Sequence, residues 1–458
     1  MLNLLDSGVL GYGISTIPDV ELNWIGKLIR ILIEGIGIVG VGIIVFTLIL
    51  KTIVLPLDIY SRIKGKKQAL IMERMRPQME KLQKQYANDK TMYNQKVVEL
   101  QKKSGYSMFG ACLPMIVSLI IFIIVFNAFS TYSQYANLKN YNDMVNVYNG
   151  VVQTYVYDET NNADGFLNEV VVDENDPSKV DYLVDYSRFA NAVKKDKQGE
   201  SGWAEKTEAE VFECLVDEYK EANGGYAGYF DKSVVNCYAG TELTNEAKSA
   251  RNTLVCFYLE GPAAQEVKDF YQGTGDYTES HNNSFLWVRN LWYPDSTLNK
   301  EIPDFAKFKS TITQANIGDD AIDGYNKVTA ALSEQKNHYN GYFILIILSI
   351  GFMLLQQWLS MRANKSVNEL STVDGSGAKT NKWMMIMMPI IYGIFSFFYS
   401  ASFSIYMITN TVYGLVTMLI INKCVDVWFK KKEASGELEE ILTKKAKKRA
   451  NKRARYRK

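Results

Sequence analysis

The chain has 458 residues, enough for one large domain or for two to three ordinary ones. Its formal net charge of +1 hides a segregation of charge. Residues 131–337 carry 34 acidic and 18 basic residues, and the remainder carries 33 basic and 16 acidic residues. Soluble globular proteins rarely sort their charges in this way. Membrane proteins concentrate Lys and Arg in short cytoplasmic loops, and their large translocated domains do not follow this bias.

Composition and motifs argue against several kinds of site. The chain has no CxxC pair and only two histidines, so we expect no zinc site. No Walker A, HExxH or GxSxG motif occurs, so we expect neither an enzyme nor a cofactor. Cys214, Cys237 and Cys256 lie in the acidic block, where they can form at most one disulfide, and their pairing stays open. The first 25 residues lack the pattern of a cleaved signal peptide, so a later apolar segment is expected to direct targeting.

Five apolar segments approach the roughly 20 residues that a helix needs to cross a bilayer. They cover residues 36–57, 109–130, 341–360, 383–400 and 401–424, and the last two are so close that they predict a tight hairpin. Residues 1–35 precede the first span. Within them Trp24, Leu28, Ile31 and Leu32 share one helical face, which predicts an amphipathic helix at the membrane interface; a plain extension of the first span is the alternative.

The distribution of basic residues predicts one orientation. Residues 59–108 carry twelve basic and four acidic residues, and the chain after Phe429 carries thirteen and four. Both regions are therefore expected to be cytoplasmic, as is the loop at residues 361–382. With five spans, the N-terminus and residues 131–340 then lie outside and the tail at residues 425–458 lies inside.

Residues 58–108 are rich in helix formers, with apolar residues at steps of three and four. The pattern predicts two antiparallel helices packed along a narrow apolar seam, with Pro77 kinking the first helix. Met72, Met75 and Met79 belong to this seam. Two interpretations remain open: a passive connector, or a mobile element whose methionines make adaptable contacts with cytoplasmic partners.

Residues 131–340 are numerous enough for a domain of their own. Residues 204–222 and 319–337 predict helices, and residues 253–260 and 284–293 predict strands, so we expect an α+β domain. No catalytic constellation stands out in it. A chaperone outside the cytoplasm, the general secretion translocon and the cell wall all remain open as its partners.

The order of the parts resembles one known family. A span with a basic residue runs into LPLDIYSR, and a charged helical hairpin follows; then come GACLP, FLW...PD, LLQQWLSMR and MMPIIYGIFSFFYSASFSIYMITNTVYG. Together they resemble the YidC-type membrane protein insertase family in its five-span layout, over residues 22–130, 285–295 and 340–425. The fold class implied is an α-helical integral membrane protein with five transmembrane helices around a hydrophilic groove, a cytoplasmic helical hairpin and an extracytoplasmic α+β inserted domain.

The resemblance implies a protein of the bacterial cell membrane that passes nascent membrane proteins into the lipid bilayer. Its groove would be open to the cytoplasm and to lipid on one side. Lys51 matches a basic groove residue that is usually Arg in the family, and lysine keeps the charge but not the bidentate fork. The other groove positions are Gln356, Gln357, Thr409, Asn410, Ser118 and Tyr406. Relatives often have Gln at the position of Ser118 and Trp at the position of Met407, so a less polar groove is expected here.

Each of these assignments has an alternative. Lys51 lies about two turns from the cytoplasmic end of its span, so its ammonium could instead reach the headgroups. Gln356, Thr409 and Asn410 could instead hold the helices together. The alternative functions are a transporter or channel subunit with an intramembrane Lys site, which would predict internal repeats, and a membrane-anchored extracytoplasmic binding protein, for which five spans are more than an anchor needs.

The tail has a dense basic run, which contains Lys444, Lys445, Lys447, Lys448, Arg449, Lys452 and Arg453. Three explanations remain open for it. The tail could contact the ribosome through RNA phosphates, bind anionic membrane lipids, or reflect only the bias that sets topology. Nascent membrane proteins and the general secretion translocon complete the expected partners.

Overall fold

The structure is a computed structural model of the chain. It describes residues 10–104, 108–171, 180–225, 231–363, 383, 387, 389–391 and 393–443, without the side chains of residues 90, 108–119 and 363. The chain forms two compact units. We call them the insert unit, with Met1–Val20, Asn137–Asn282 and Ile302–Asn337, and the membrane unit, with Glu21–Ala136, Asn283–Glu301 and His338–Lys458.

The membrane unit begins with a separate helix, α1 (Trp24–Ile36). The Asn23 side chain caps its start by accepting a hydrogen bond from the Gly26 N–H at 2.7 Å. Gly37 ends it in the left-handed conformation, with φ 79°. Its buried face contains Ile25, Ile29 and Ile33. The segment is therefore a helix of its own rather than an extension of the first span.

α2 (Val39–Gln85) carries the first apolar segment and continues without a break into the charged hairpin. It contains Pro56 and Pro77, each of which removes one backbone hydrogen bond without ending the helix. α3 (Lys90–Lys103) follows after Asp89, whose side chain caps its first turn. The two helices predicted for the hairpin are confirmed, and the first of them is the far end of the span helix itself.

Within the described ranges, three helices are long and apolar enough to cross a membrane: α2, α12 (Ile344–Ala363) and α15 (Ala401–Ala434). Each presents large apolar side chains outward, as lipid contact requires. Examples are Ile53, Ile347 and Ile420. The second predicted segment lies in α4 (Met108–Gly150), and the fourth contains a shorter apolar helix, Pro389–Phe398.

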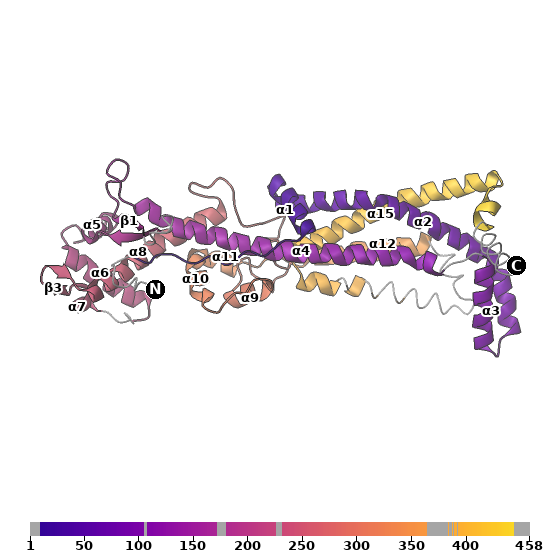
Figure 1. The fold of residues 1–458 in the computed structure, drawn as a ribbon, viewed down its shortest axis with the longest axis horizontal. Helices are drawn as coiled ribbons and strands as arrows, with labels where there is room; N and C mark the ends of the chain where they lie inside the picture. Colours follow the sequence, from indigo (N-terminus) through magenta and orange to yellow (C-terminus); the bar gives the residue numbers. More distant parts are fainter. Residues whose placement is uncertain are drawn as a thin grey trace. The chain divides into compact units, whose positions relative to one another are not determined.

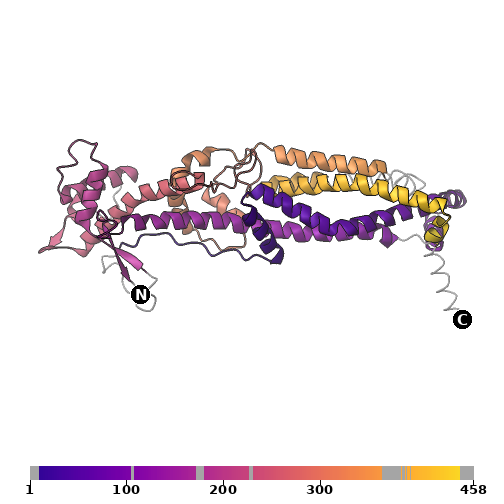
Figure 2. The same ribbon diagram turned by 90° about the horizontal axis from the view of Figure 1, so that it is seen from above.

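α2 and α15 lie side by side and run in the same direction (Figures 1 and 2). The residues that they join ascend together along both helices: Thr52 with Tyr413 at 3.5 Å, Arg62 with Asn422 at 3.0 Å and Lys66 with Asp426 at 2.7 Å. α4 runs against them. Its Phe129 packs on Phe46 of α2, with ring centroids 5.5 Å apart, whereas Ile121 and Phe122, which come earlier in α4, line one cavity with Leu50 and Lys51, which come later in α2.

The insert unit is mainly helical. Its helices are α5 (Tyr186–Asp196), α6 (Glu208–Ala222), α7 (Lys232–Val235), α8 (Asn245–Gln272), α9 (Phe305–Thr311), α10 (Ala321–Val328) and α11 (Ser333–Asn337), with 3-10 turns η2 (Val151–Tyr155) and η3 (Ala330–Leu332). Two antiparallel pairs complete it: β1 (Leu167–Val171) with β2 (Val180–Val184), and β3 (Tyr238–Ala239) with β4 (Glu242–Leu243). The N-terminal segment joins this unit, because the Leu10 N–H donates to the Tyr182 carbonyl at 2.8 Å.

Two of the four predicted elements of this region are wrong. Residues 253–260 lie inside α8, where Leu254, Val255 and Leu259 are buried at helical spacing, so tertiary burial overrides the strand preference of their side chains. Residues 284–293 form a loop with a single bridge between Phe285 and Val288. Residues 204–222 are confirmed as α6, which starts with a capping box at Thr207, and residues 319–337 are helical in three short pieces.

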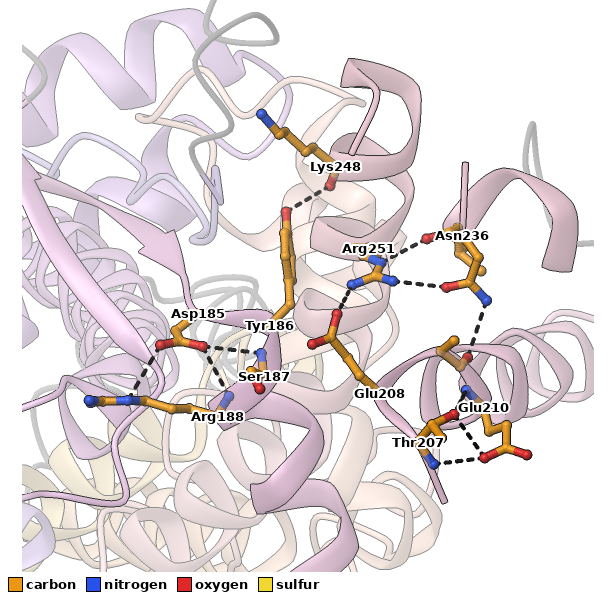
Figure 3. A network of polar contacts seen from close by, with 12 residues as sticks. Asp185, Tyr186, Ser187, Arg188, Thr207, Glu208, Glu210, Asn236, Lys248 and Arg251 are labelled. Carbon is orange, nitrogen blue, oxygen red and sulfur yellow. Dashed lines mark hydrogen bonds and ion pairs between the residues drawn. The ribbon is translucent and has the colours of Figure 1, made fainter. Parts of the chain in front are cut away.

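The centre of the insert unit is the fully buried Arg251 of α8 (Figure 3). Its guanidinium forms an ion pair with Glu208 and donates to the Asn236 side chain at 2.8 Å and to the Val235 carbonyl at 2.7 Å. It also lies 4.2 Å from the ring centroid of Phe212. The guanidinium, which belongs to α8, thus joins this helix to α6 through Glu208 and to the end of α7 through Val235 and Asn236.

We expect the Arg251→Ala variant to lose about 3–5 kcal/mol of unfolding free energy in the insert unit, because it leaves a carboxylate and a carbonyl without their buried partner. Protease resistance of residues 137–282 in the full chain, followed against denaturant, measures the loss. The matched control is Lys195→Ala, which removes the exposed pair with Asp164. A control that loses as much as Arg251→Ala would contradict this account.

Candidate functional site

A cavity of about 200 Å³ lies among the apolar helices of the membrane unit. α2, α4, α12, α15 and the apolar helix Pro389–Phe398 all contribute to its wall. Its polar lining is unusual for such a place: it includes Lys51, Asp58, Gln356, Gln357, Asn410 and Thr411. Amide, hydroxyl and charged groups around one space favour a cavity that holds water rather than an empty apolar one.

One face of α2 supplies the charges of this cavity. Lys51, Val54 and Asp58 are spaced by three and four residues, so they share a side of the helix. Lys51 and Asp58 are half-buried, and they stand about 10 Å apart along the helix axis at 1.5 Å per residue. The sequence therefore places a cation and an anion on the same wall, two turns apart.

Lys51 and Asp58 attract each other across this wall without forming an ion pair within the described part of the chain. No hydrogen bond or ion pair there engages the Lys51 ammonium or the Asp58 carboxylate. One turn further along α2, the Arg62 guanidinium donates to the Asn422 side chain at 3.0 Å instead of pairing with Asp58. Two half-buried charges that form no ion pair must be solvated, because an unsolvated charge in an apolar bundle costs several kcal/mol.

Gly414 of α15 leaves room for the side-chain amide of Gln356 in the cavity wall. A Cβ added to Gly414 would lie 2.5 Å from the Gln356 Nε2, so a larger residue at position 414 would move this amide from its present place. Asn410 lies one turn before Gly414 on the same side of α15, and Tyr406 one turn earlier again. Gln356 of α12 is thereby held against the polar face of α15.

The structure brings together five of the predicted groove residues, namely Lys51, Gln356, Gln357, Tyr406 and Asn410. Thr409 is not in the lining, and its hydroxyl donates to the Ile405 carbonyl at 2.9 Å. Thr411 takes the expected place two positions further on. The side chain of Ser118 lies outside the described residues.

Sequence reasoning missed Asp58, because it follows directly on the last apolar residues and looks like the end of the span. Its spacing of seven from Lys51 is the signal that could have found it, since residues seven apart return to the same helix face. Met353 was missed as well, and it joins Met407 in the apolar part of the wall.

A second cavity, of about 390 Å³, lies in the insert unit between α5, the loop at residues 162–165 and α8. Its charged groups have local partners: Arg188 pairs with Asp185 at 3.4 Å, Lys195 with Asp164 at 2.7 Å, and Asp196 accepts from the Tyr258 hydroxyl. Because these charges already have partners, the smaller cavity around Lys51 is the stronger candidate for a functional site.

The loop Asn283–Glu301 gathers the first turns of three helices. Asp295 is fully buried, and its carboxylate accepts from the N–H groups of Tyr342 at 2.8 Å and Leu345 at 2.6 Å. It therefore caps α12 from a distant part of the sequence. The Ala401 N–H at the start of α15 donates to the Tyr293 carbonyl at 2.9 Å.

The same loop contacts α2, and the side-chain amide of Asn340 holds its backbone in place. The Phe285 ring occupies the space that a Cβ on Gly40 would fill. Asn340, which is fully buried, accepts from the Asn290 N–H at 2.7 Å and donates to the carbonyls of Asn290 and Pro294, both at 2.9 Å. α2, α12 and α15 thus all start at this loop, and the cavity lies further along them.

We expect Asp295→Ala to lower the unfolding free energy of the membrane unit by about 3 kcal/mol, because two buried N–H groups lose a charged acceptor. Thermal unfolding in detergent measures this loss. Asp89→Ala is the matched control in the same unit, since Asp89 caps α3 from an exposed position, where a cap contributes about 1 kcal/mol. Equal losses of unfolding free energy in the two variants would show that the buried cap stabilises the protein no more than an exposed one.

Met72, Met75 and Met79, which the sequence places in the apolar seam of the hairpin, are buried in the structure. They are 2–3% exposed and pack against Ile421, Val425 and Phe429 of α15. The seam of the first hairpin helix faces α15 because α2 and α15 continue side by side beyond the apolar segment. The hypothesis of adaptable methionine contacts with cytoplasmic partners stays a prediction, and in this structure the three methionines contact α15.

A short segment after α15 covers the same methionines. Gly436, with φ 71°, turns the chain back, and Leu438 and Leu442 join the methionine core. Arg74 pairs with Glu439 at 2.6 Å, and Lys67 donates to the carbonyl of Ile441. The predicted partner-binding residues Lys444, Lys445, Lys447, Lys448, Arg449, Lys452 and Arg453 lie outside the described residues.

In a chain whose native cysteines are replaced by Ser, we expect Met75→Cys to react slowly with a water-soluble thiol reagent. Truncation after Ser435 removes the covering segment and raises that rate severalfold. Val98→Cys, on the exposed side of α3, serves as the control and reacts fast in both lengths of chain. A Met75→Cys rate that is fast in the full chain would contradict the buried core.

The sequence model of the family described as 60Kd inner membrane protein matches residues 31–156 and 268–430, which is well over half of the chain. The chain is also similar to proteins named membrane protein insertase YidC. It is 41% identical over 59 residues to that of Leptospira interrogans, which is 13% of this chain and 9% of that protein.

Two further relatives with that name are similar. The protein of Fusobacterium nucleatum is 38% identical over 76 residues, 17% of this chain and 35% of the relative. The protein of Oceanobacillus iheyensis is 36% identical over 84 residues, 18% of this chain and 31% of the relative. The matched part of the chain thus spans about a third or less of the length of these curated relatives, and no solved structure matches it significantly.

The family match covers the loop Asn283–Glu301 and all the helices that line the cavity, and it leaves residues 157–267 of the insert unit unmatched. Three apolar helices long enough to cross a bilayer agree with a multi-pass membrane protein. The chain therefore belongs to the 60Kd inner membrane protein family, also called the YidC/Oxa1 family.

Proposed function

We propose that the chain is an insertase of the bacterial cell membrane, in which the cavity around Lys51 is the inner part of a groove for nascent membrane proteins. The observation that carries the proposal is an ammonium that forms no hydrogen bond or ion pair with the described residues, inside a polar cavity whose surrounding helices are suited to lipid. The names of the relatives support it, since each is called a membrane protein insertase.

The mechanism follows from the cost of moving polar groups into lipid. A client segment that must cross the bilayer carries polar or acidic residues, and each would lose its water in the hydrocarbon core. A wet cavity with a fixed cation removes part of that loss by offering hydrogen bonds and a charge partner. The apolar helix of the client then leaves sideways into lipid, where burial of about 20 apolar residues drives insertion. No nucleotide takes part.

The directions of the helices support a five-span arrangement around this groove. α2, α12 and α15 start together at the loop Asn283–Glu301, and α4 runs against them. We propose that this loop closes the outer end, with the N-terminus and the insert unit outside the cell. The hairpin and the basic tail then face the cytoplasm, where the tail meets the ribosome or lipid headgroups.

Complementation tests the function. We expect the chain to restore insertion of a small two-span client in bacteria depleted of their own insertase. Lys51→Ala should lower insertion about tenfold, the equivalent of one charge-assisted contact of about 1.4 kcal/mol. Lys51→Arg should keep it, because the charge is retained. Protease protection of the client loop measures insertion.

Lys67→Ala is the matched control, because Lys67 lies on the same helix outside the cavity and serves the covering segment instead. Failure of the unchanged chain to restore insertion would refute the insertase function. Equal rescue by the chains with Lys, Arg and Ala at position 51 would refute the role of the ammonium alone.

A further inference from the structure

The cavity holds a second charge whose presence the proposed mechanism does not explain. Asp58 lines the same wall as Lys51, and neither group forms an ion pair or hydrogen bond with the described residues. If the carboxylate served only to neutralise the ammonium, a spacing of three or four residues would let the two touch. A spacing of seven places their backbone positions about 10 Å apart along the axis, so the two groups attract each other without closing an ion pair, and each can still bind a charged group of a client.

The order of the two charges along the groove is fixed by α2. Gly40, at the start of the helix, packs against Phe285 of the loop Asn283–Glu301. Lys51 is then about 16 Å and Asp58 about 27 Å from that end, at 1.5 Å per residue. Asp58 lies toward the hairpin, and Lys51 lies deeper. A segment that enters from the hairpin side meets the anion before the cation.

Asp58 attracts Lys51 and Arg62 electrostatically, but neither cation forms an ion pair with it among the described residues. The nearest cation further along the helix is Arg62, and its guanidinium is held by Asn422 at 3.0 Å. Lys66 pairs with Asp426 on the outer side of the same helix pair at 2.7 Å. The two cations beyond the cavity therefore have partners on α15, whereas the carboxylate faces the cavity.

We propose that Asp58 is a specificity-determining residue, which holds basic residues of a client at the mouth of the groove while Lys51 takes acidic residues deeper. This inference rests on the proposed insertase function. The two charges together sort the client by sign: an acidic or neutral flank passes to Lys51 and crosses, and a basic flank is bound at Asp58 and repelled by Lys51. The preferred client therefore has basic residues on the cytoplasmic side of its first span.

Three matched two-span clients test this, with a translocated loop that is neutral, carries two Asp, or carries two Lys. In the unchanged chain we expect the Lys loop to cross poorly relative to the neutral loop. Asp58→Asn, which keeps the shape and removes the charge, should raise the ratio of Lys-loop to neutral-loop crossing about fivefold, as expected for one partly screened charge pair. Asp58→Glu should keep the original ratio.

Asp426→Asn is the control, because it removes an acidic residue from α15 outside the cavity lining. The proposal is overturned if Asp58→Asn leaves the ratio unchanged. It is also overturned if the substitution lowers the crossing of all three client loops alike, as the loss of a merely structural residue would. The neutral loop reports separately on the proposed function: its failure to cross in the unchanged chain refutes the insertase itself.

Discussion

Solvation of one cation within an apolar helix bundle is the constraint on which the membrane unit depends. Lys51 forms no hydrogen bond or ion pair with the described residues, so the surroundings must supply water or polar groups. The bundle does so with two amides from α12 and with an amide and a hydroxyl from α15. Glycine 414 then lets the α12 amide approach α15. The cavity is thus a consequence of the charge, since hydrophobic packing alone would close it.

The loop Asn283–Glu301 fixes the geometry of the polar cavity. Asp295 and Asn340 fix where α12 starts, and every residue further along the helix inherits that register. A shift of one residue would rotate Gln356 by about 100° away from the cavity, because the helix turns once every 3.6 residues. Buried caps at one end therefore decide which side chains meet the cation several turns away.

The sequence was sufficient for the long apolar helices, because about 20 apolar residues in a row have few alternatives to a membrane span. It also placed Lys51, Gln356 and Asn410 around one site, through resemblance to a family. It failed where tertiary contacts decide. Residues 253–260 have strand-forming side chains but are buried on a helix. Thr409 and Thr411 differ by helical phase, which a short polar stretch does not fix, and the partner of the methionine seam is a segment more than 300 residues away.

The loop that gathers the starts of α2, α12 and α15 has a consequence for the order of biosynthesis. It follows the end of the second apolar segment by more than 150 residues, because the insert precedes it in the chain. At translation rates of about 5–20 residues per second, the ribosome needs about 10–30 s between residue 130 and Asp295. During that interval α2 and α4 exist in the nascent chain without the loop that later joins their bundle, so their early survival depends on lipid or on another chain.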